Sequence, residues 1–294
     1  MKPTLDYGPD VLDNASAFTH PFFDRFELRH AASPIRLDAN THKNYKFPTF
    51  YGDVTSALGI FHCSYAKAEK MMLDPRMKPV RMTRGRSLVV FSCYEYRNVL
   101  GVPPYNEIAM TIPVMVDPTV HVPVLPMVLD VFKGFGYQVF SMPVTSEENR
   151  IRGHEIWGLP KTLEEIDIRE DGDDCVTRAT EMGADEPYFE LRVPTSGKPT
   201  EFDVSSNIYS EFQGSLVRAK THFQGTFNVN KHMSLLFRTG VEPDRRYLTL
   251  GEGPSAQVLK DLEIEAHPFQ LRYAKTMNSC FDVPEPVGSD VVER

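Results

Sequence analysis

The stretch SLVVFSCYEY, residues 87–96, is a continuous run of apolar, β-branched and aromatic residues. A run of this length and composition is typical of a buried β-strand. The stretch EIAMTIPVMV, residues 107–116, has the same character, and Pro113 indicates that it lies at an edge or carries a bulge. The two stretches predict that this part of the chain forms a sheet.

The same pattern continues toward the C-terminus. LEEIDIRE (163–170) and CVTRATEM (175–182) flank the acidic segment EDGDD (170–174). Asp and Gly tolerate the backbone conformations of a tight turn, so these residues predict a β-hairpin. Three more strands are expected at residues 137–144, 187–194 and 245–253.

Helical patterns are few and short. Residues 64–73, SYAKAEKMML, carry a broad apolar stripe at helical spacing, with Ser64 as the N-cap. Two more short helices are expected at residues 125–136 and 255–262. Many closely spaced strands with few helices predict an α+β, β-dominated chain built on an antiparallel sheet or barrel.

Composition excludes several classes of protein. The 294 residues include 32 basic and 40 acidic side chains, a formal net charge of −8, and there is no Lys/Arg block, which argues against nucleic-acid binding. No run of about 18 apolar residues is present, and the Asp-rich start lacks the apolar segment of a secretory signal. We therefore expect a cytoplasmic protein with no membrane or nucleic-acid partner. The 23 prolines outnumber the 18 glycines, which disfavours long helices.

The cysteines show no pattern of a metal or redox site. None of the four forms a C-x-x-C pair, and none has a histidine at a zinc-ligand spacing. Without an export signal, disulfides are not expected. We interpret them as buried or semi-buried free thiols and expect no metal and no cofactor; a catalytic Cys–His pair has no local support. The four are Cys63, Cys93, Cys175 and Cys280.

The stretch RGHEIWGLPKTLEEI, residues 152–166, is the candidate for chemistry. Pro160 fixes its own φ and biases Leu159 toward an extended backbone, so Lys161 is expected at the start of a strand. Apolar neighbours, among them Trp157, would remove water from the ammonium group and lower its pKa. A neutral lysine amine attacks ketones. A lysine after such a turn is also commonly a solvated surface residue, and the residues alone leave both interpretations open.

The segment GHEIWGLPK resembles the G-R-E-x-x-x-x-P-K segment of the acetoacetate decarboxylase family, whose lysine after proline forms a Schiff base with a ketone. The resemblance maps this nucleophile onto Lys161. YNEIAMTIPV (105–114) resembles the family's Y-x-E-x-x-x-x-I-P-V stretch and maps an active-site glutamate onto Glu107. A weaker match over residues 247–276 lies near the family's C-terminal helix and final strand.

The resemblance implies the family's fold, an antiparallel double sheet or cone-shaped β-barrel with a few short helices, over residues 46–283. Residues 1–45 are then an N-terminal arm or subdomain, and residues 284–294 a short C-terminal tail. The aromatic residues of the arm suggest that it packs on the body of the chain or on a neighbouring subunit. Members of the family commonly form homo-oligomers, so a homo-oligomer is expected.

Three positions depart from the family's pattern. The second lysine that typically follows the nucleophile is Thr162 here, so desolvation alone would have to lower the pKa of Lys161. The family's arginine aligns near Val54, and a further glutamate aligns with Ser92. Relatives with such substitutions use the same lysine for aldolase–dehydratase chemistry on pyruvate and aldehydes.

Neighbouring residues have more than one possible role. Arg152 is a candidate for binding a substrate carboxylate, although a rim arginine is more often a surface charge. Tyr105 lies on the same strand face as Glu107 and is expected either to hydrogen-bond an intermediate or to pack. Trp157 is expected to be a pocket wall or core residue. Glu155 is expected to brace the lysine loop by hydrogen bonds, and His154 to be structural.

Taken together, these features predict a Schiff-base lyase whose partner is a small keto acid. The first hypothesis is a β-keto-acid decarboxylase of the acetoacetate type. The second is an aldolase–dehydratase that condenses pyruvate with an aldehyde, which the missing lysine and arginine favour. The alternative from another class is a non-catalytic small-molecule binder with the same fold, against which the presence of both Lys161 and Glu107 argues.

Overall fold

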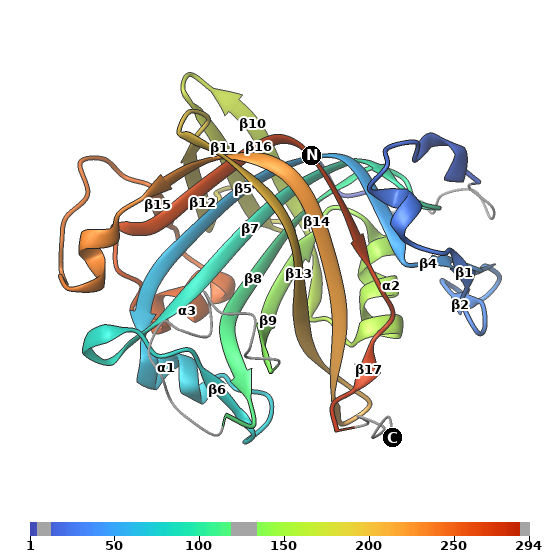
Figure 1. Cartoon of the computed structure of the whole chain (residues 1–294), viewed down its shortest axis with the longest axis horizontal. Helices are drawn as coiled ribbons and strands as arrows, with labels where there is room; N and C mark the ends of the chain where they lie inside the picture. Colours follow the sequence, from blue (N-terminus) through green and yellow to red (C-terminus); the bar gives the residue numbers. More distant parts are fainter. Residues whose placement is uncertain (5–12, 119–133, 289–294) are drawn as a thin grey trace.

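Seven long strands close into a barrel in the computed structural model, which describes residues 1–4, 13–118 and 134–288 (Figure 1). Going around the barrel, each strand pairs with the next, and the last pairs again with the first. Neighbouring strands are antiparallel, except that the first two run parallel. The order is β9 (Phe135–Val144), β13 (Lys198–Phe212), β14 (Ser215–Lys231), β16 (Pro268–Phe281), β5 (Thr49–Ser64), β7 (Arg86–Val99) and β8 (Tyr105–Val116).

Outer strands extend the barrel into a second layer. Beyond β9 the sheet continues through β10, which is parallel to β9, and then through three antiparallel strands. The predicted hairpin is confirmed, because β10 and β11 are antiparallel neighbours whose pairing continues to the turn, where Asp171 lies opposite Asp174. The outer strands are β10 (Lys161–Asp171), β11 (Asp174–Glu181), β12 (Phe189–Pro194) and β15 (Leu248–Leu250), with β6 (Met77–Pro79) beside β8 and β17 (Glu285–Pro286) beside β14.

Both faces of β7 and β8 are covered, which explains their continuous apolar runs. On one face Phe91 and Ile108 join a core shared with the outer strands, where the ring centroids of Phe91 and Phe189 lie 5.1 Å apart. On the other face Ser92 and Glu107 line the inside of the barrel. The predicted β-dominated double-layer barrel is therefore confirmed. The bulge expected at Pro113 lies two residues earlier, between Met110 and Thr111 in the pairing of β8 with β9.

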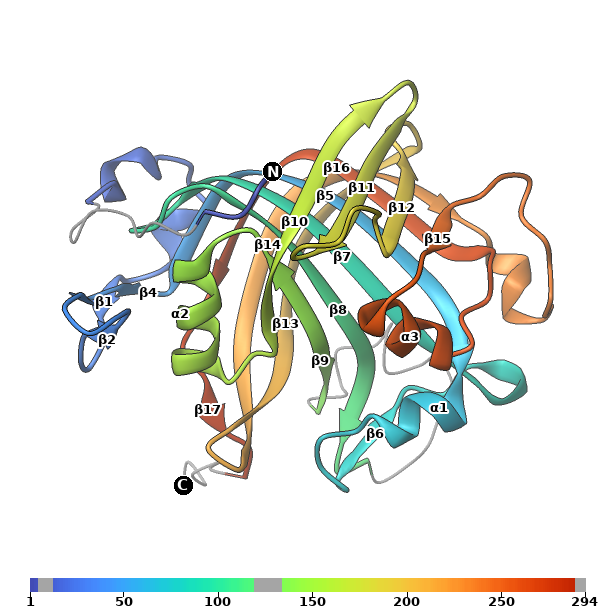
Figure 2. The same ribbon diagram turned by 180° about the vertical axis from the view of Figure 1, so that it is seen from behind.

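The three α-helices found in the described residues are short. α1 (Tyr65–Lys70) falls inside the predicted helix 64–73, and α3 (Pro254–Asp261) matches the predicted helix 255–262. Most of the helix predicted at 125–136 lies outside the described residues, and its last two residues begin β9. The longest helix, α2 (Glu147–Trp157), was not predicted; Figure 2 shows it beside β9 and β10.

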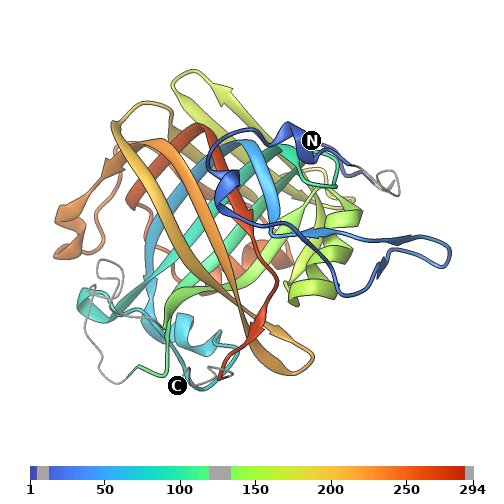
Figure 3. The ribbon, with the colours of Figure 1, turned by 45° about the vertical axis from the view of Figure 1, so that its right-hand side comes forward.

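The N-terminal segment packs on the body of its own chain at one end of the barrel (Figure 3). Phe18, Phe22 and Phe23 are buried, and the ring centroid of Phe23 lies 4.9 Å from that of Phe50 in β5. The segment contains two short helical turns and two small antiparallel strand pairs. They are η1 (Ala15–Ala17), η2 (Phe23–Arg25), β1 (Arg29–His30) with β4 (Lys46–Phe47), and β2 (Ile35–Arg36) with β3 (His42–Lys43).

All four cysteines are buried free thiols, as predicted. Two further short helical turns complete the described elements, η3 (Thr83–Gly85) and η5 (Met233–Leu236). Within residues 1–4, 13–118 and 134–288, no helix combines the length and the apolar character needed to cross a membrane.

Candidate active site

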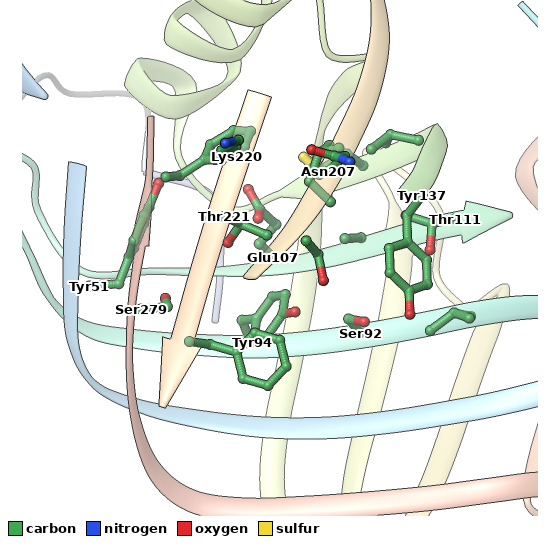
Figure 4. Close-up of a pocket in the computed structure, with 18 of the residues that line it drawn as sticks. Tyr51, Ser92, Tyr94, Glu107, Thr111, Tyr137, Asn207, Lys220, Thr221 and Ser279 are labelled. Carbon is green, nitrogen blue, oxygen red and sulfur yellow. The ribbon is translucent and has the colours of Figure 1, made fainter. Parts of the chain in front are cut away.

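The inside of the barrel holds a cavity of about 1440 Å³ (Figure 4). All seven barrel strands contribute side chains to its wall, together with α2 and the first residue of β10. Figure 4 shows Glu107, Ser92 and Tyr137 extending into this space from β8, β7 and β9. Lys161, Glu107, Arg152 and Trp157 of the predicted site residues line the cavity, whereas Tyr105 does not.

The connection from β9 through α2 to β10 determines where Lys161 lies. α2 begins after Ser146, whose side chain accepts a hydrogen bond from the Asn149 backbone, and ends at Trp157, with Gly158 as its C-cap. Gly158 has φ +62°, a left-handed conformation that glycine adopts without strain, and a Cβ there would collide with the Glu211 backbone. The chain therefore turns sharply after α2, and Lys161 becomes the first residue of β10.

Gly153 in α2 packs directly against the nucleophile candidate. A Cβ at this position would lie 2.7 Å from Cε of Lys161 and would also collide with Cδ and Cγ. Only a glycine lets the helix approach the extended lysine side chain so closely. The glycine of the sequence motif thus has a steric role, and the aliphatic part of Lys161 is held between α2 and the barrel wall.

Lys161 and Glu107 form a buried pair inside the barrel. Lys161 Nζ donates a hydrogen bond to Glu107 Oε2 at 2.6 Å, although the two residues are 54 positions apart in sequence. Both side chains are less than a tenth exposed. The other carboxylate oxygen, Oε1, accepts a hydrogen bond from the Tyr96 hydroxyl at 3.3 Å. The two residues that the motifs single out therefore meet at hydrogen-bonding distance.

The pKa of Lys161 is lowered from its ordinary value, chiefly because burial removes water from the ammonium group. The Glu107 carboxylate opposes this shift and raises the pKa, and the Arg152 guanidinium lowers it. Thr162, where the family has a second lysine, is exposed and donates a hydrogen bond to Glu164. Both residues lie on the face of β10 opposite to that of Lys161. A neighbouring cation does act on Lys161, but it comes from α2, so the expectation that desolvation acts alone was incomplete.

Arg152 is buried, not on the rim, and is only 1% exposed. Its guanidinium donates hydrogen bonds to the Asn149 side-chain oxygen at 2.9 Å and to the Thr49 hydroxyl at 3.1 Å. Nε is buried without a hydrogen-bond partner, and no carboxylate among the described residues pairs with Arg152. A buried, unpaired guanidinium on a cavity wall is suited to an anion.

Four tyrosines surround the carboxylate of Glu107. The ring centroid of Tyr96 lies 4.6 Å from Tyr51, 5.3 Å from Tyr94 and 4.9 Å from Tyr105. Burial raises the pKa of all four, to about 12 for Tyr51 and Tyr94, so their hydroxyls stay protonated and can donate hydrogen bonds. Of the four, only Tyr105 was predicted as a site residue; the alternation of Tyr94 and Tyr96 with Ser92 on one face of a strand was the available signal.

Tyr105 and Trp157 support the site in different ways. The Tyr105 ring lies 5.7 Å from Lys161 Nζ, behind the cavity wall. Trp157, at the end of α2, is buried, lines the cavity and stacks on Phe281 with ring centroids 5.0 Å apart. Its indole nitrogen donates a hydrogen bond to the Asp282 carbonyl at 2.7 Å. The indole anchors the end of α2 to β16 and forms part of the pocket wall.

The positions that depart from the family's pattern have different surroundings. Val54 is fully buried in a hydrophobic core, so no charge stands there, whereas Ser92 lines the cavity. Glu155 is exposed, and among the described residues its side chain makes no hydrogen bond to the lysine loop, so the bracing role predicted for it was wrong. His154 takes that role through a 2.8 Å hydrogen-bond contact between Nε2 and the Lys161 carbonyl. In the part of the chain that the structure describes, no three His, Cys, Asp or Glu side chains cluster as metal ligands.

Comparisons with known proteins agree with this architecture. The family model for acetoacetate decarboxylase matches residues 32–211. The solved acetoacetate decarboxylase from Legionella pneumophila is 14% identical, with a TM-score of 0.56 over 82% of this chain and 87% of that one. A second solved acetoacetate decarboxylase is also 14% identical, with a TM-score of 0.54 over 82% of this chain and 89% of that one. These likenesses concern the fold, and no curated protein sequence matches the chain.

Proposed function

The chain belongs to the acetoacetate decarboxylase family, and from this premise we propose that it is a lyase that forms a Schiff base between Lys161 and a keto acid. The reaction that we propose is decarboxylation of a β-keto acid. The observation that carries the proposal is the buried contact of 2.6 Å between Lys161 Nζ and Glu107 Oε2 inside a cavity. A lysine with a lowered pKa beside a carboxylate is what imine chemistry requires.

The proposed reaction begins with attack of the neutral Lys161 amine on the ketone carbon. The carbinolamine that forms loses water and becomes an iminium ion. The bond to the β-carboxylate then breaks, CO₂ leaves, and the electron pair moves into the iminium to give an enamine. Protonation of the enamine carbon followed by attack of water releases the ketone product and restores the amine.

Glu107 is suited to move the protons that these steps require. Its carboxylate can take a proton from the Lys161 ammonium and give it to the departing carbinolamine hydroxyl, which leaves as water. A second proton, taken up from solvent in the net reaction, would then reprotonate the carboxylate, which passes it to the enamine carbon. The hydrogen bond from Tyr96 fixes the orientation of the carboxylate. General acid–base catalysis of this kind contributes roughly 10²–10⁴-fold to a rate.

Arg152 is the proposed binding group for the substrate carboxylate. Its guanidinium lies on the cavity wall, acts electrostatically on Lys161 and has no carboxylate partner among the described residues. An arginine can bind a carboxylate through two parallel hydrogen bonds. This residue would replace the arginine that the family carries elsewhere, at a position that aligns near Val54 of this chain.

Borohydride trapping tests the proposal. The protein is incubated with acetoacetate, reduced, and weighed intact, and we expect one covalent adduct that Lys161→Ala lacks, together with release of CO₂. Glu107→Gln should still form the adduct but decarboxylate about 10²–10⁴-fold more slowly. Absence of an adduct with every keto acid tried would exclude the lyase and favour the non-catalytic binder.

A second candidate is aldolase–dehydratase chemistry on pyruvate and an aldehyde through the same lysine. The observation that favours it is the replacement of the family's second lysine by Thr162 and of its glutamate by Ser92, which lines the cavity. An adduct with pyruvate that releases no CO₂ and condenses with an added aldehyde would identify this reaction. An adduct only with β-keto acids would exclude it.

A further inference from the structure

The cavity is much larger than a small keto acid requires. Its volume of about 1440 Å³ exceeds the roughly 300–1,000 Å³ of pockets that hold drug-sized ligands. Beyond Glu107 the wall continues along β8 to Thr111, and four residues of a strand span roughly 13 Å. The space beside Lys161 therefore extends well past the position of the proposed reaction.

A second arginine, which is half-buried, lies on the wall of this extension. Arg272 in β16 lines the cavity and lies over the ring of Phe202, with the guanidinium carbon 4.7 Å from the ring centroid. One of its nitrogens donates a hydrogen bond of 3.3 Å to the Gln270 side chain, and Nε is buried with no partner. No carboxylate among the described residues pairs with Arg272.

The strand register places Arg272 farther along the barrel than Glu107. Glu107 in β8 pairs directly with Tyr94 in β7. Arg272 in β16 pairs with Leu58 in β5, and Leu58 in turn pairs with Ser92 in β7. Ser92 is two residues from Tyr94, so the two levels differ by roughly 7 Å along the strands. Since β16 is three strands away from β8 in one direction and four in the other, the two groups lie on opposite walls.

Among the described residues, no anionic side chain of the protein pairs with Arg272 or is a cause of its pKa shift. Burial lowers its pKa, and the one titratable group that acts on it is the Tyr137 hydroxyl of β9, whose own pKa is raised by burial. The carboxylates that line the cavity are paired with other cations, Glu107 with Lys161, Asp203 with Arg25 and Glu285 with Arg218. A desolvated guanidinium without a counter-ion is costly in an empty cavity and favourable when an anion binds it.

We propose that Arg272 binds a second carboxylate, at the far end of an extended substrate whose keto-acid end lies at Lys161. The proposed substrate class is therefore a dicarboxylic keto acid, and this inference rests on the proposed Schiff-base function for the identity of the reacting end. Arg152 would bind the reacting carboxylate and Arg272 the distal one, and the apolar wall with Phe202 and Val139 would contact the chain between them.

Equilibrium binding of unreactive dicarboxylates tests the distal site without any covalent step. Calorimetry would compare the saturated diacids from succinate to azelate with their monomethyl esters on the wild-type protein. We expect the best diacid to bind about tenfold or more tightly than its monoester, because a hydrogen bond to a charged group is lost in the ester. Equal affinity of diacid and monoester at every chain length would overturn the proposal.

Substitutions at Arg272 test whether this residue causes the preference for the diacid over its monoester. Arg272→Met should remove the preference for the diacid, and Arg272→Lys, which keeps the charge, should restore part of it. The matched control is Lys220→Met, which removes another positive charge from the cavity wall but at an exposed side chain, and should keep the preference within about twofold. Loss of the preference in Lys220→Met but not in Arg272→Met would contradict the assignment to Arg272.

Trapping experiments separate this inference from the proposed function. Borohydride would be added with acetoacetate, with 3-oxoadipate and with the distal monomethyl ester of 3-oxoadipate. If all three compounds form adducts at Lys161 and reach half-maximal trapping at the same concentration, the lyase proposal stands and the distal site is excluded. If the diacids bind preferentially through Arg272 but no keto acid is trapped, the distal site stands and the lyase fails.

Discussion

Three charged side chains, Lys161, Glu107 and Arg152, determine the protonation of the proposed nucleophile. Desolvation lowers the pKa of Lys161, the Arg152 cation lowers it further, and the Glu107 carboxylate opposes both. A protonated lysine cannot attack a ketone, so imine formation should be slow at low pH and rise as pH increases through this lowered pKa. The acidic limb of the pH profile therefore reports the pKa of Lys161.

Replacing Arg152 with Met should move that limb to higher pH. The substitution removes a cation that lowers the pKa of Lys161, so the pKa rises and less neutral amine is present at any given pH. The rate of borohydride trapping measured against pH checks this expectation. Arg150→Met, on the same helix but paired with Glu147, is the control and should leave the limb in place. A limb that stays at its wild-type pH in Arg152→Met would contradict the electrostatic role.

Gly153→Ala should change the free energy of unfolding in the opposite direction from an ordinary glycine-to-alanine substitution in a helix. Alanine in place of a helical glycine normally stabilises by about 0.5–1 kcal/mol. Here the new Cβ would overlap the Lys161 side chain, so we expect a loss of about 1–3 kcal/mol and a displaced amine that traps keto acids slowly. Denaturant unfolding and trapping rates measure both effects, with the exposed Glu155→Ala as control. A variant that gains stability and keeps its trapping rate would exclude the steric role.

The sequence predicted the central pair of the site but not its surroundings. The two motifs were sufficient for Lys161 and Glu107 because each motif is contiguous in sequence. Arg152 was interpreted as a possible rim charge because its burial depends on α2, which was not predicted. Tyr51 and Arg272 come from strands far apart in the chain, and only the closed barrel brings them to one cavity.

At the scale of elements, α2 differs from most surface helices because its inward face is polar. Lys43 Nζ and the Tyr45 hydroxyl both donate hydrogen bonds to Glu148 Oε1, at 2.7 and 2.8 Å, and all three side chains are buried. Arg152 follows Glu148 by one helical turn on the same side. Hydrophobic periodicity, the usual signal for a helix, is therefore absent, which is why the sequence did not predict α2.

Glu148→Ala should be strongly destabilising. It leaves the Lys43 ammonium buried without its partner, and breaking a buried pair in this way costs about 3–5 kcal/mol. Denaturant unfolding measures the loss. The neighbouring Glu147→Ala, which breaks a partly exposed pair with Arg150, should cost less than about 1 kcal/mol. The double variant Lys43→Met with Glu148→Leu should recover most of the stability, and equal losses for the two glutamates would contradict the argument.

The strands were predicted best where they carry long runs of mostly apolar and aromatic residues. β7, β8 and β9 matched their predicted ranges closely because a buried strand reads as a continuous apolar run. β13 and β14 were not predicted individually, since many of their residues are polar and only partly buried. Composition alone could not show that these two strands complete a barrel.

At the scale of the molecule, the N-terminal segment and the barrel share a core. Phe22 is 1% exposed and belongs to a cluster that includes Phe23 and Phe50. Phe22→Ala should therefore lower the free energy of unfolding by about 3–5 kcal/mol, measured in denaturant. Phe237→Ala, at a side chain that is 67% exposed, should change it by less than about 0.5 kcal/mol. If Phe22→Ala were as mild as Phe237→Ala, the segment would not contribute to the stability of the barrel.

The pairing of β5 with β16 has a consequence for how the protein is made. These strands are neighbours in the barrel although more than two hundred residues separate their starts. Chains are synthesised from the N-terminus, and domains generally fold as units once they are complete. The ring of strands cannot close on the ribosome until residues up to Phe281 have emerged from the exit tunnel. A nascent chain that already contains Lys161 and Glu107 thus lacks one wall of the cavity, and we infer that catalytic competence arises only at the end of translation.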